Sequence, residues 1–250
     1  MKNKYRNEWK MIQYILSTER YKFIFILSIL LSLYGGFVLG VPRENFIDSL
    51  LKPFTFYFFS IFFFALAFIN NMNVCAILKE DFPYYVLRLK TKKEYVKMVI
   101  RLSIMLFFIC FIVVLAFLLM CLFLTTFHNI EISPYKTYSI TNLSYCLFHF
   151  LRYFLYGMLL IVISSLLYIN TNTKIVIGYA ALILAFIFVN NVSISFVNIA
   201  PYFATSYFSQ VNFSSFSIEV IWSLGVLIAL EVIVLLLYRI TIKNKRIEVL

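Results

Sequence analysis

The sequence is poor in charged residues, which make up 13% of its 250 positions, about half the share of roughly 25% found in soluble proteins. Apolar residues make up 63%, against roughly 45–50% in soluble domains. So few charges could not cover so large an apolar core in water, which excludes a disordered tail and an ordinary cytosolic enzyme. The composition indicates a polytopic membrane protein.

Motifs for catalysis and ligand binding are equally scarce. The four cysteines form no C-x-x-C pair, and the two histidines, His128 and His149, are far apart. The sequence has no G-x-x-x-x-G-K-[S/T] phosphate loop, no H-E-x-x-H and no G-x-S-x-G motif. We therefore expect no catalytic residues, no metal site and no cofactor in this chain. The net charge of +11 is expected to face cytoplasm and anionic lipid, and not nucleic acid.

Six apolar stretches are long enough to span a bilayer, since ~30 Å of hydrocarbon needs about 20 helical residues. They cover residues 23–41, 54–78, 102–127, 145–169, 175–197 and 218–238. None alternates apolar and polar residues as a β-barrel strand does, and helices satisfy their own backbone hydrogen bonds in lipid. The sequence predicts one all-α transmembrane domain over residues 1–250 with six spanning helices.

Lysine and arginine are distributed unevenly about these spans. Eighteen of the 22 fall on the side that carries both termini, three fall on the other side, and Arg152 lies within a span. Cytoplasmic segments of membrane proteins are enriched in these residues. We therefore expect both termini in the cytoplasm.

The N-terminal segment, residues 1–22, has the pattern of an amphipathic helix. Tyr5, Trp9, Ile12 and Leu16 recur at i, i+4, i+7 and i+11, which places them on one helical face. A basic helix of this kind lies in the membrane interface with its aromatic residues at headgroup depth. Two interpretations remain open, a plain basic anchor and a helix with a mechanical role.

The largest segment on the basic side is residues 79–101. It mixes apolar side chains such as Leu87, Leu89 and Tyr95 with its charges, so it can form a short helix with a docking face. The alternative is a basic loop that only sets the topology.

Three charged residues lie within or at the ends of the expected spans. Arg152 is ~10 Å below the outer end of the fourth span, and Glu219 begins the sixth span from the same side. Arg152 could therefore extend outward and meet Glu219. Glu231 lies ~18 Å deeper, where a charge costs at least ~2.5–3.5 kcal/mol. We interpret it either as a polar clamp between helices or as a residue of a transport pathway.

Two further features concern packing and the outer surface. Gly36 and Gly40 have the G-x-x-x-G spacing that lets membrane helices approach closely. Residues 198–217 are too polar for a clean span and too apolar for a free loop, and Pro201 interrupts them. We expect an outer re-entrant or interfacial segment there, shielded by protein.

This layout resembles the ABC-2-type permeases of ABC transporters, and the clearest likeness in detail is in residues 79–101. Glu80 and Asp81 supply the acidic opening of the family pattern, Leu87 and Leu89 its apolar turn, and the sequence 94–97 its aromatic-plus-Lys ending. The chain departs from the pattern where Phe82-Pro83 stands in place of Gly-Thr and where residues 90–92 replace a proline-containing turn.

The resemblance implies a bacterial plasma-membrane exporter subunit with a separate ATPase, which would bind the ATP and Mg²⁺, and a second permease subunit, either a copy or a relative. Residues 79–101 would then act as a coupling helix, with Glu80, Asp81, Leu87, Leu89 and Tyr95 as the coupling residues. The apolar composition favours a hydrophobic or amphipathic cargo, a peptide or a lipid. The alternatives are a non-catalytic membrane assembly or sensor protein without an ATPase, and an intramembrane enzyme, for which His149 and Arg152 lack an acidic partner in their own span.

Overall fold

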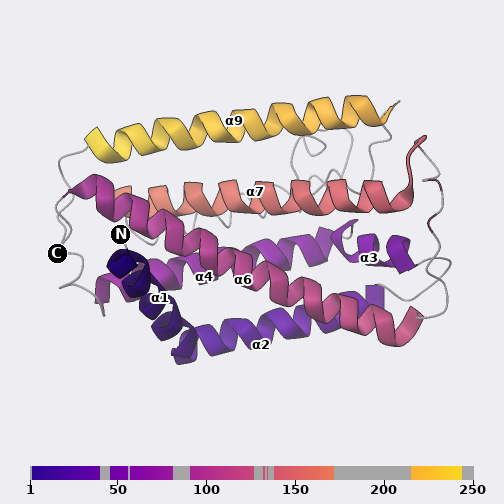
Figure 1. The fold of residues 1–250 in the computed structure, drawn as a ribbon, viewed down its shortest axis with the longest axis horizontal. Coiled ribbons are helices and arrows are strands. Elements are labelled where there is room, and N and C mark those ends of the chain that lie inside the picture. The colour runs from indigo at the N-terminus through magenta and orange to yellow at the C-terminus, as the bar shows by residue number, and fades with distance from the viewer. Residues whose placement is uncertain are drawn as a thin grey trace.

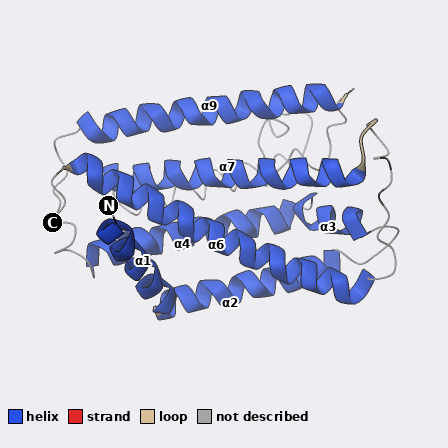
Figure 2. Cartoon of the chain, viewed as in Figure 1, coloured by secondary structure: helices blue, strands red, loops and turns tan. Residues whose placement is uncertain are grey.

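The computed structural model describes residues 2–39, 46–55, 57–80, 91–126, 132, 134, 138–171 and 215–243. Within these ranges the chain is helical apart from short turns and one isolated bridge between Pro134 and Thr141 (Figure 2). The elements are α1 (Lys2–Ser17), α2 (Glu19–Tyr34), the π-helical segment η1 (Gly35–Leu39), α3 (Phe46–Thr55), α4 (Tyr57–Glu80), α6 (Lys92–Thr126), α7 (Asn142–Asn170) and α9 (Phe216–Lys243).

Four stretches of the described helices are long and apolar enough to cross a membrane. These are Tyr21–Val38, Lys93–Leu124, Asn142–Asn170 and Phe216–Lys243. The prediction of a helical membrane protein is therefore confirmed. The expected second span contains a shorter apolar helix, Phe62–Leu78, and the expected fifth span, residues 175–197, lies outside the described residues.

Several boundaries differ from the expected ones. The N-terminal segment divides at Thr18 into two helices, and the expected second span begins within α3 and continues as α4. Residues 92–101 are the first turns of α6, because no helix-breaking residue separates them from the apolar run that follows. Of the expected outer segment, only 215–217 are described, and Phe216 and Ser217 begin α9.

The long helices lie side by side along the long axis of the molecule (Figure 1). α7 contacts α9, α6 and α4, while α2 packs on α6 and α4. α1 crosses one end of this bundle, where α2 and α6 begin and where α4, α7 and α9 end, whereas α3 lies at the opposite end. Segments that sequence places on one side of the membrane are thus together in space.

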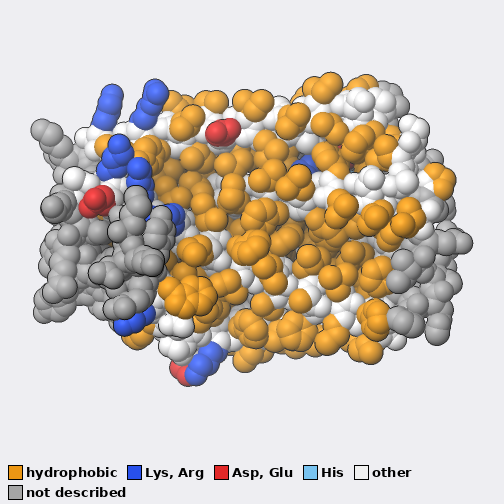
Figure 3. Space-filling model, in the orientation of Figure 1, with side chains coloured by type: hydrophobic (Ala, Val, Ile, Leu, Met, Phe, Trp, Pro, Cys, Tyr) orange, Lys and Arg blue, Asp and Glu red, His pale blue; other side chains and the backbone are white. Residues whose placement is uncertain are grey.

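Charge separates along the same axis. Lysine and arginine side chains gather at the end of the bundle that carries α1, and apolar side chains cover its middle (Figure 3). We call this end the basic end and define it by the exposed residues Lys10, Lys93, Lys97, Arg239 and Lys243. An apolar belt of this kind is what a bilayer requires of a spanning bundle.

Aromatic rings fill the core. Tyr153 of α7 is fully buried, with its ring centroid 5.0 Å from that of Phe64 and 5.5 Å from that of Phe63. On the next turn of α7, Gly157 lies so close to the ring of Phe107 on α6 that a Cβ atom at this position would overlap it. The missing side chain at Gly157 is therefore what lets α6 and α7 approach this closely.

Candidate functional site: a buried polar cluster between α7 and α9

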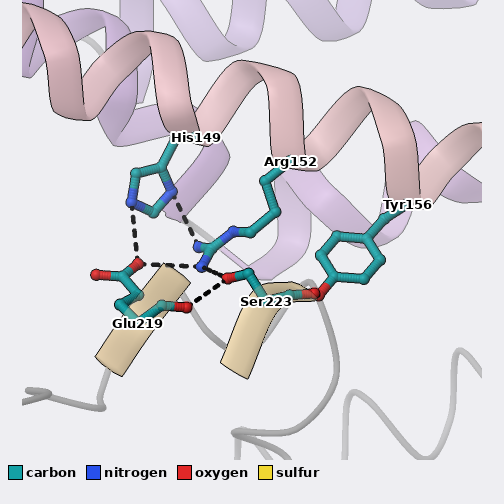
Figure 4. Close-up of polar contacts among 5 residues, drawn as sticks. All are labelled: His149, Arg152, Tyr156, Glu219 and Ser223. Carbon is teal, nitrogen blue, oxygen red and sulfur yellow. Dashed lines mark hydrogen bonds and ion pairs between the residues drawn. The ribbon is translucent and has the colours of Figure 1, made fainter. Parts of the chain in front are cut away.

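Among the described residues, buried charged side chains from two helices meet at one place, which joins α7 to α9 (Figure 4). On α7, His149, Arg152 and Tyr156 recur at i, i+3 and i+7 and therefore share one face. On α9, Glu219 and Ser223 are one turn apart and face them. We call these five residues the α7–α9 cluster.

Arg152 is the centre of this cluster. Its Nη1 atom donates to Glu219 Oε1 at 3.0 Å and to Ser223 Oγ at 2.9 Å. Tyr156 donates its hydroxyl proton to the backbone oxygen of Ser223 at 3.1 Å. Arg152 and Glu219 are each only 2% exposed. Since a carboxylate or guanidinium in so dry a place needs an opposite charge, each residue of this pair stabilises the burial of the other.

His149 completes the cluster as a neutral ring. Its Nδ1 atom lies 3.1 Å from Nη2 of Arg152, and arginine can only donate, so Nδ1 must accept. The ring proton is then on Nε2, which lies 3.5 Å from Glu219 Oε1. With one positive and one negative charge among its members, the cluster is neutral overall, which suits burial between membrane helices.

Aromatic rings cover the cluster. The guanidinium carbon of Arg152 lies 5.2 Å from the centre of the Phe148 ring, within the range of a cation–π contact. Phe216, at the start of α9, packs edge-on against Phe148, and Tyr145 packs edge-on against His149. These rings exclude water from the charged pair, which strengthens its electrostatic attraction.

The cluster can hold two helices together, and one of its oxygen atoms can accept a further hydrogen bond. Glu219 Oε2 is buried and receives no hydrogen bond from a described residue. No group of three or more His, Cys, Asp or Glu side chains in the described ranges is placed to hold a metal ion. We conclude that the cluster fixes α9 to α7.

A second polar group, uncharged, lies between α4, α6 and α7. Ser165 Oγ is 3.1 Å from Asn71 Oδ1, 3.1 Å from Ser103 Oγ and 2.9 Å from the backbone oxygen of Ile161. Asn71 also donates to that backbone oxygen at 3.3 Å. We call Asn71, Ser103 and Ser165 the central amide–serine group. This group was not predicted from the sequence, although each of its residues interrupts an apolar run.

The charged residues singled out from the sequence differ in whether the structure brings them to a polar partner. Arg152 and Glu219 meet, as expected for an Arg152 side chain that extends outward along its span. The acidic partner that His149 and Arg152 lack in their own span comes from α9. Glu231 is exposed on α9 and has no hydrogen bond or ion pair with a described residue. Ser223 and Tyr156 were missed, although each lies one turn beyond a singled-out charge.

Part of the apolar face of α1 is covered by protein. Ile12 is buried together with Met11 and Ile15, and these side chains belong to one cluster with residues of α4 and α6 near the basic end. We call this the α1–α4–α6 cluster, and Leu16 packs against it. Trp9, expected on the same face, is 52% exposed. The side chain of Tyr5 lies outside the described residues.

The expected coupling residues are described only in part. Tyr95 is half-buried in the first turn of α6 and packs against the α1–α4–α6 cluster, so its ring supports the fold there. Glu80 ends α4, but its side chain is not described, and Asp81, Leu87 and Leu89 lie outside the described residues.

The expected glycine pair is also described only in part. Gly36 of η1 is buried so close to α6 that a Cβ atom there would overlap that of Cys121. Gly40 lies outside the described residues. The close approach at Gly36 is therefore between helices of this chain.

Comparisons with protein-family models, with curated proteins and with solved structures find no match to this chain.

Proposed function

We propose that this chain is the transmembrane subunit of an ATP-driven exporter of the ABC-2 type, with six spanning helices and both termini in the cytoplasm of a bacterial cell. A separate ATPase subunit would supply the energy, and a second permease subunit would complete the membrane part. The observation that carries this proposal is the packing of α1 against α4 and α6 at the basic end.

That packing supports a mechanical role for the basic end. The resemblance assigns residues 79–101 to ATPase docking, and this segment includes the end of α4 at Glu80 and the start of α6 at Lys92. α1 contacts both of these helices through one cluster. A force applied to this segment would therefore act on α1, α4 and α6 together. Coupling between distant sites requires contiguous packing of this kind.

The length of α6 carries such a push into the bilayer. α6 has 35 residues and is therefore ~52 Å long, whereas the hydrocarbon core is ~30 Å thick. The helix is continuous from its basic first turn to the opposite end of the bundle. α6 contacts α2, α3 and α7 along its length. A displacement of its basic end would therefore be transmitted to these helices without an intervening hinge.

The proposed cargo is a hydrophobic or amphipathic peptide or lipid. The charges buried between described membrane helices are neutralised within the α7–α9 cluster, and apolar side chains cover the middle of the bundle (Figure 3). A route between two such subunits would offer few fixed charges to an ion or a sugar.

The test is purification of the full chain from native membranes, followed by reconstitution in vesicles. We expect an ATPase to co-purify, ATP hydrolysis to respond to amphipathic peptides, and Leu87→Asp to remove the ATPase. Leu143→Asp is the matched control, because Leu143 is exposed on the first turn of α7 at the opposite end. If the chain transports without ATP, the proposal is wrong. If no ATPase co-purifies and no transport is seen, the proposal is also wrong, and an assembly or sensor role is favoured.

A further inference from the structure

α9 is the long helix with the least protein around it. Of its described side chains, Glu219, Ser223 and Thr241 are buried, and the partly buried Val234, Leu237 and Tyr238 pack against a cluster that includes residues of α7. Most of the remaining surface of α9 is apolar and exposed. Exposed apolar residues alone would suit a lipid-facing helix, so they do not indicate a partner.

Glu231 does not suit a lipid-facing helix. It lies fifteen residues after Phe216 and twelve before Lys243, which places it ~18–22 Å from each end of α9, near the middle of the bilayer. Its side chain is exposed and has no polar partner among the described residues. Acidic side chains at this depth are rare on lipid-facing surfaces and pair with other polar groups.

The residues around Glu231 form a continuous stripe. Leu224, Ile228, Glu231 and Leu235 recur at i, i+4, i+7 and i+11 and are all exposed. This 4–3–4 spacing is that of the contact seam between two parallel helices, in which a single polar residue fixes register and partner. We call these four residues the α9 seam.

We propose that the α9 seam is the contact between two copies of this chain, with the Glu231 carboxyl groups hydrogen-bonded to each other. The inference rests on the proposed function for the expectation of paired membrane subunits, and it adds that the partner is a second copy. Two copies in one membrane are related by a two-fold axis along the bilayer normal, so equivalent residues meet at equal depth. A second copy therefore brings a carboxyl group to the level of Glu231, and neutral carboxyl groups can both donate and accept.

Cross-linking of the full chain in vesicles without any ATPase tests the contact. Ile228 and Ile233 are both exposed on α9 at similar depth, at 60% and 43%, but they lie about 140° apart around the helix. With a short bismaleimide we expect Ile228→Cys to give a covalent dimer and Ile233→Cys to give none. The unsubstituted chain gives the background, since its four native cysteines are buried.

The role of Glu231 is tested by measuring the dimer dissociation constant in vesicles by energy transfer between labelled copies. Glu231→Leu should weaken association about 3- to 30-fold, the range measured for hydrogen bonds between membrane helices. Glu231→Gln keeps a donor and an acceptor and should stay within about twofold of the parent chain. Both substitutions are on an exposed face, so monodisperse folded protein is expected for each.

Equal cross-linking at positions 228 and 233, no cross-linking at either, or cross-linking of position 228 to a different protein would overturn the proposal. So would an association constant that Glu231→Leu leaves unchanged. Because the vesicles contain no ATPase, these outcomes are independent of whether an ATPase co-purifies with the chain. Failure of the dimer and failure of the exporter proposal can thus be told apart.

Discussion

Arg152 on α7 donates a 3.0 Å hydrogen bond to Glu219 on α9, although 67 residues separate them in the chain. Both side chains are almost fully buried, so the loss of one leaves the other as an uncompensated charge. Breaking a buried pair in this way costs about 3–5 kcal/mol. We expect Glu219→Leu or Arg152→Leu to lower the free energy of unfolding by that amount, measured by denaturant titration in bicelles.

The double substitution is the informative companion to these single variants. When both charges are removed, no lone charge is left, so Arg152→Leu/Glu219→Leu should be more stable than either single variant. Glu19→Gln provides the control, since Glu19 and Lys22 form an exposed ion pair of 2.6 Å and exposed pairs contribute about 0–1 kcal/mol. A double variant less stable than both singles would contradict the assignment of a mutually compensating pair.

The central amide–serine group gives a second prediction. Ser165→Ala removes the hydroxyl that lies between Asn71 and Ser103, and hydrogen bonds between membrane helices average about 0.6 kcal/mol with a maximum near 1.7. We expect a loss of that size in the free energy of unfolding. The neighbouring Ser164 is also buried, but its hydroxyl has no partner among the described residues. Ser164→Ala should therefore cost nothing, and an equal loss in both variants would argue against the network.

The contact between Gly157 and Phe107 gives a third prediction. Phe107 is held by the rings of Phe111 and Phe154, so it cannot move aside freely for a new Cβ atom. Gly157→Ala should lower the thermal unfolding midpoint, with overpacking costing about 1–3 kcal/mol, and Phe107→Leu should restore part of the loss. Gly225→Ala is the control, because nothing lies within 4 Å of the Cβ it would add, and it should not lower the midpoint.

The docking of α1 gives a fourth prediction. Ile15 is fully buried in the α1–α4–α6 cluster, so Ile15→Ala should cost about 2–5 kcal/mol of packing and loosen α1 from the bundle. Hydrogen exchange of the α1 amides should accelerate in this variant. Gln13→Ala, on the exposed side of the same helix, should leave exchange unchanged. The same exchange rate in both variants would indicate that α1 lies on lipid alone.

The spans of α7 and α9 and the end of α6 could be predicted to within about five residues, because membrane insertion depends on local apolar length, which a sequence states directly. The end of α3 at Thr55 and the start of α4 at Tyr57 could not be predicted, because the apolar run continues across both positions. The same continuity hid the start of α6 at Lys92. The length of an apolar run therefore predicts that a span is present better than it predicts the residues at which the helix begins and ends.

Depth along the bilayer was readable from sequence, but rotation about each helix axis was not. Counting residues from the span ends puts Arg152 about 10 Å below the outer end of its span and Glu219 at the outer end of its own, and the long Arg152 side chain reaches Glu219 across that difference. Which helices are neighbours, and which faces they turn to each other, depends on packing between distant segments. Ser223, Tyr156 and the contact of Asn71 with Ser165 were therefore beyond reach, and so was the exposed position of Glu231.

α9 is fastened to α7 near both of its ends. Arg152 and Tyr156 hold its first turns, and Asn170 donates to Thr241 in its last turns. An axial slide of α9 by one helical turn, about 5.4 Å, would pull both fastenings out of hydrogen-bond reach at once. We therefore expect α9 and α7 to move together as one rigid body. Any relative movement of helices in the working protein would then occur at contacts other than the one between α7 and α9.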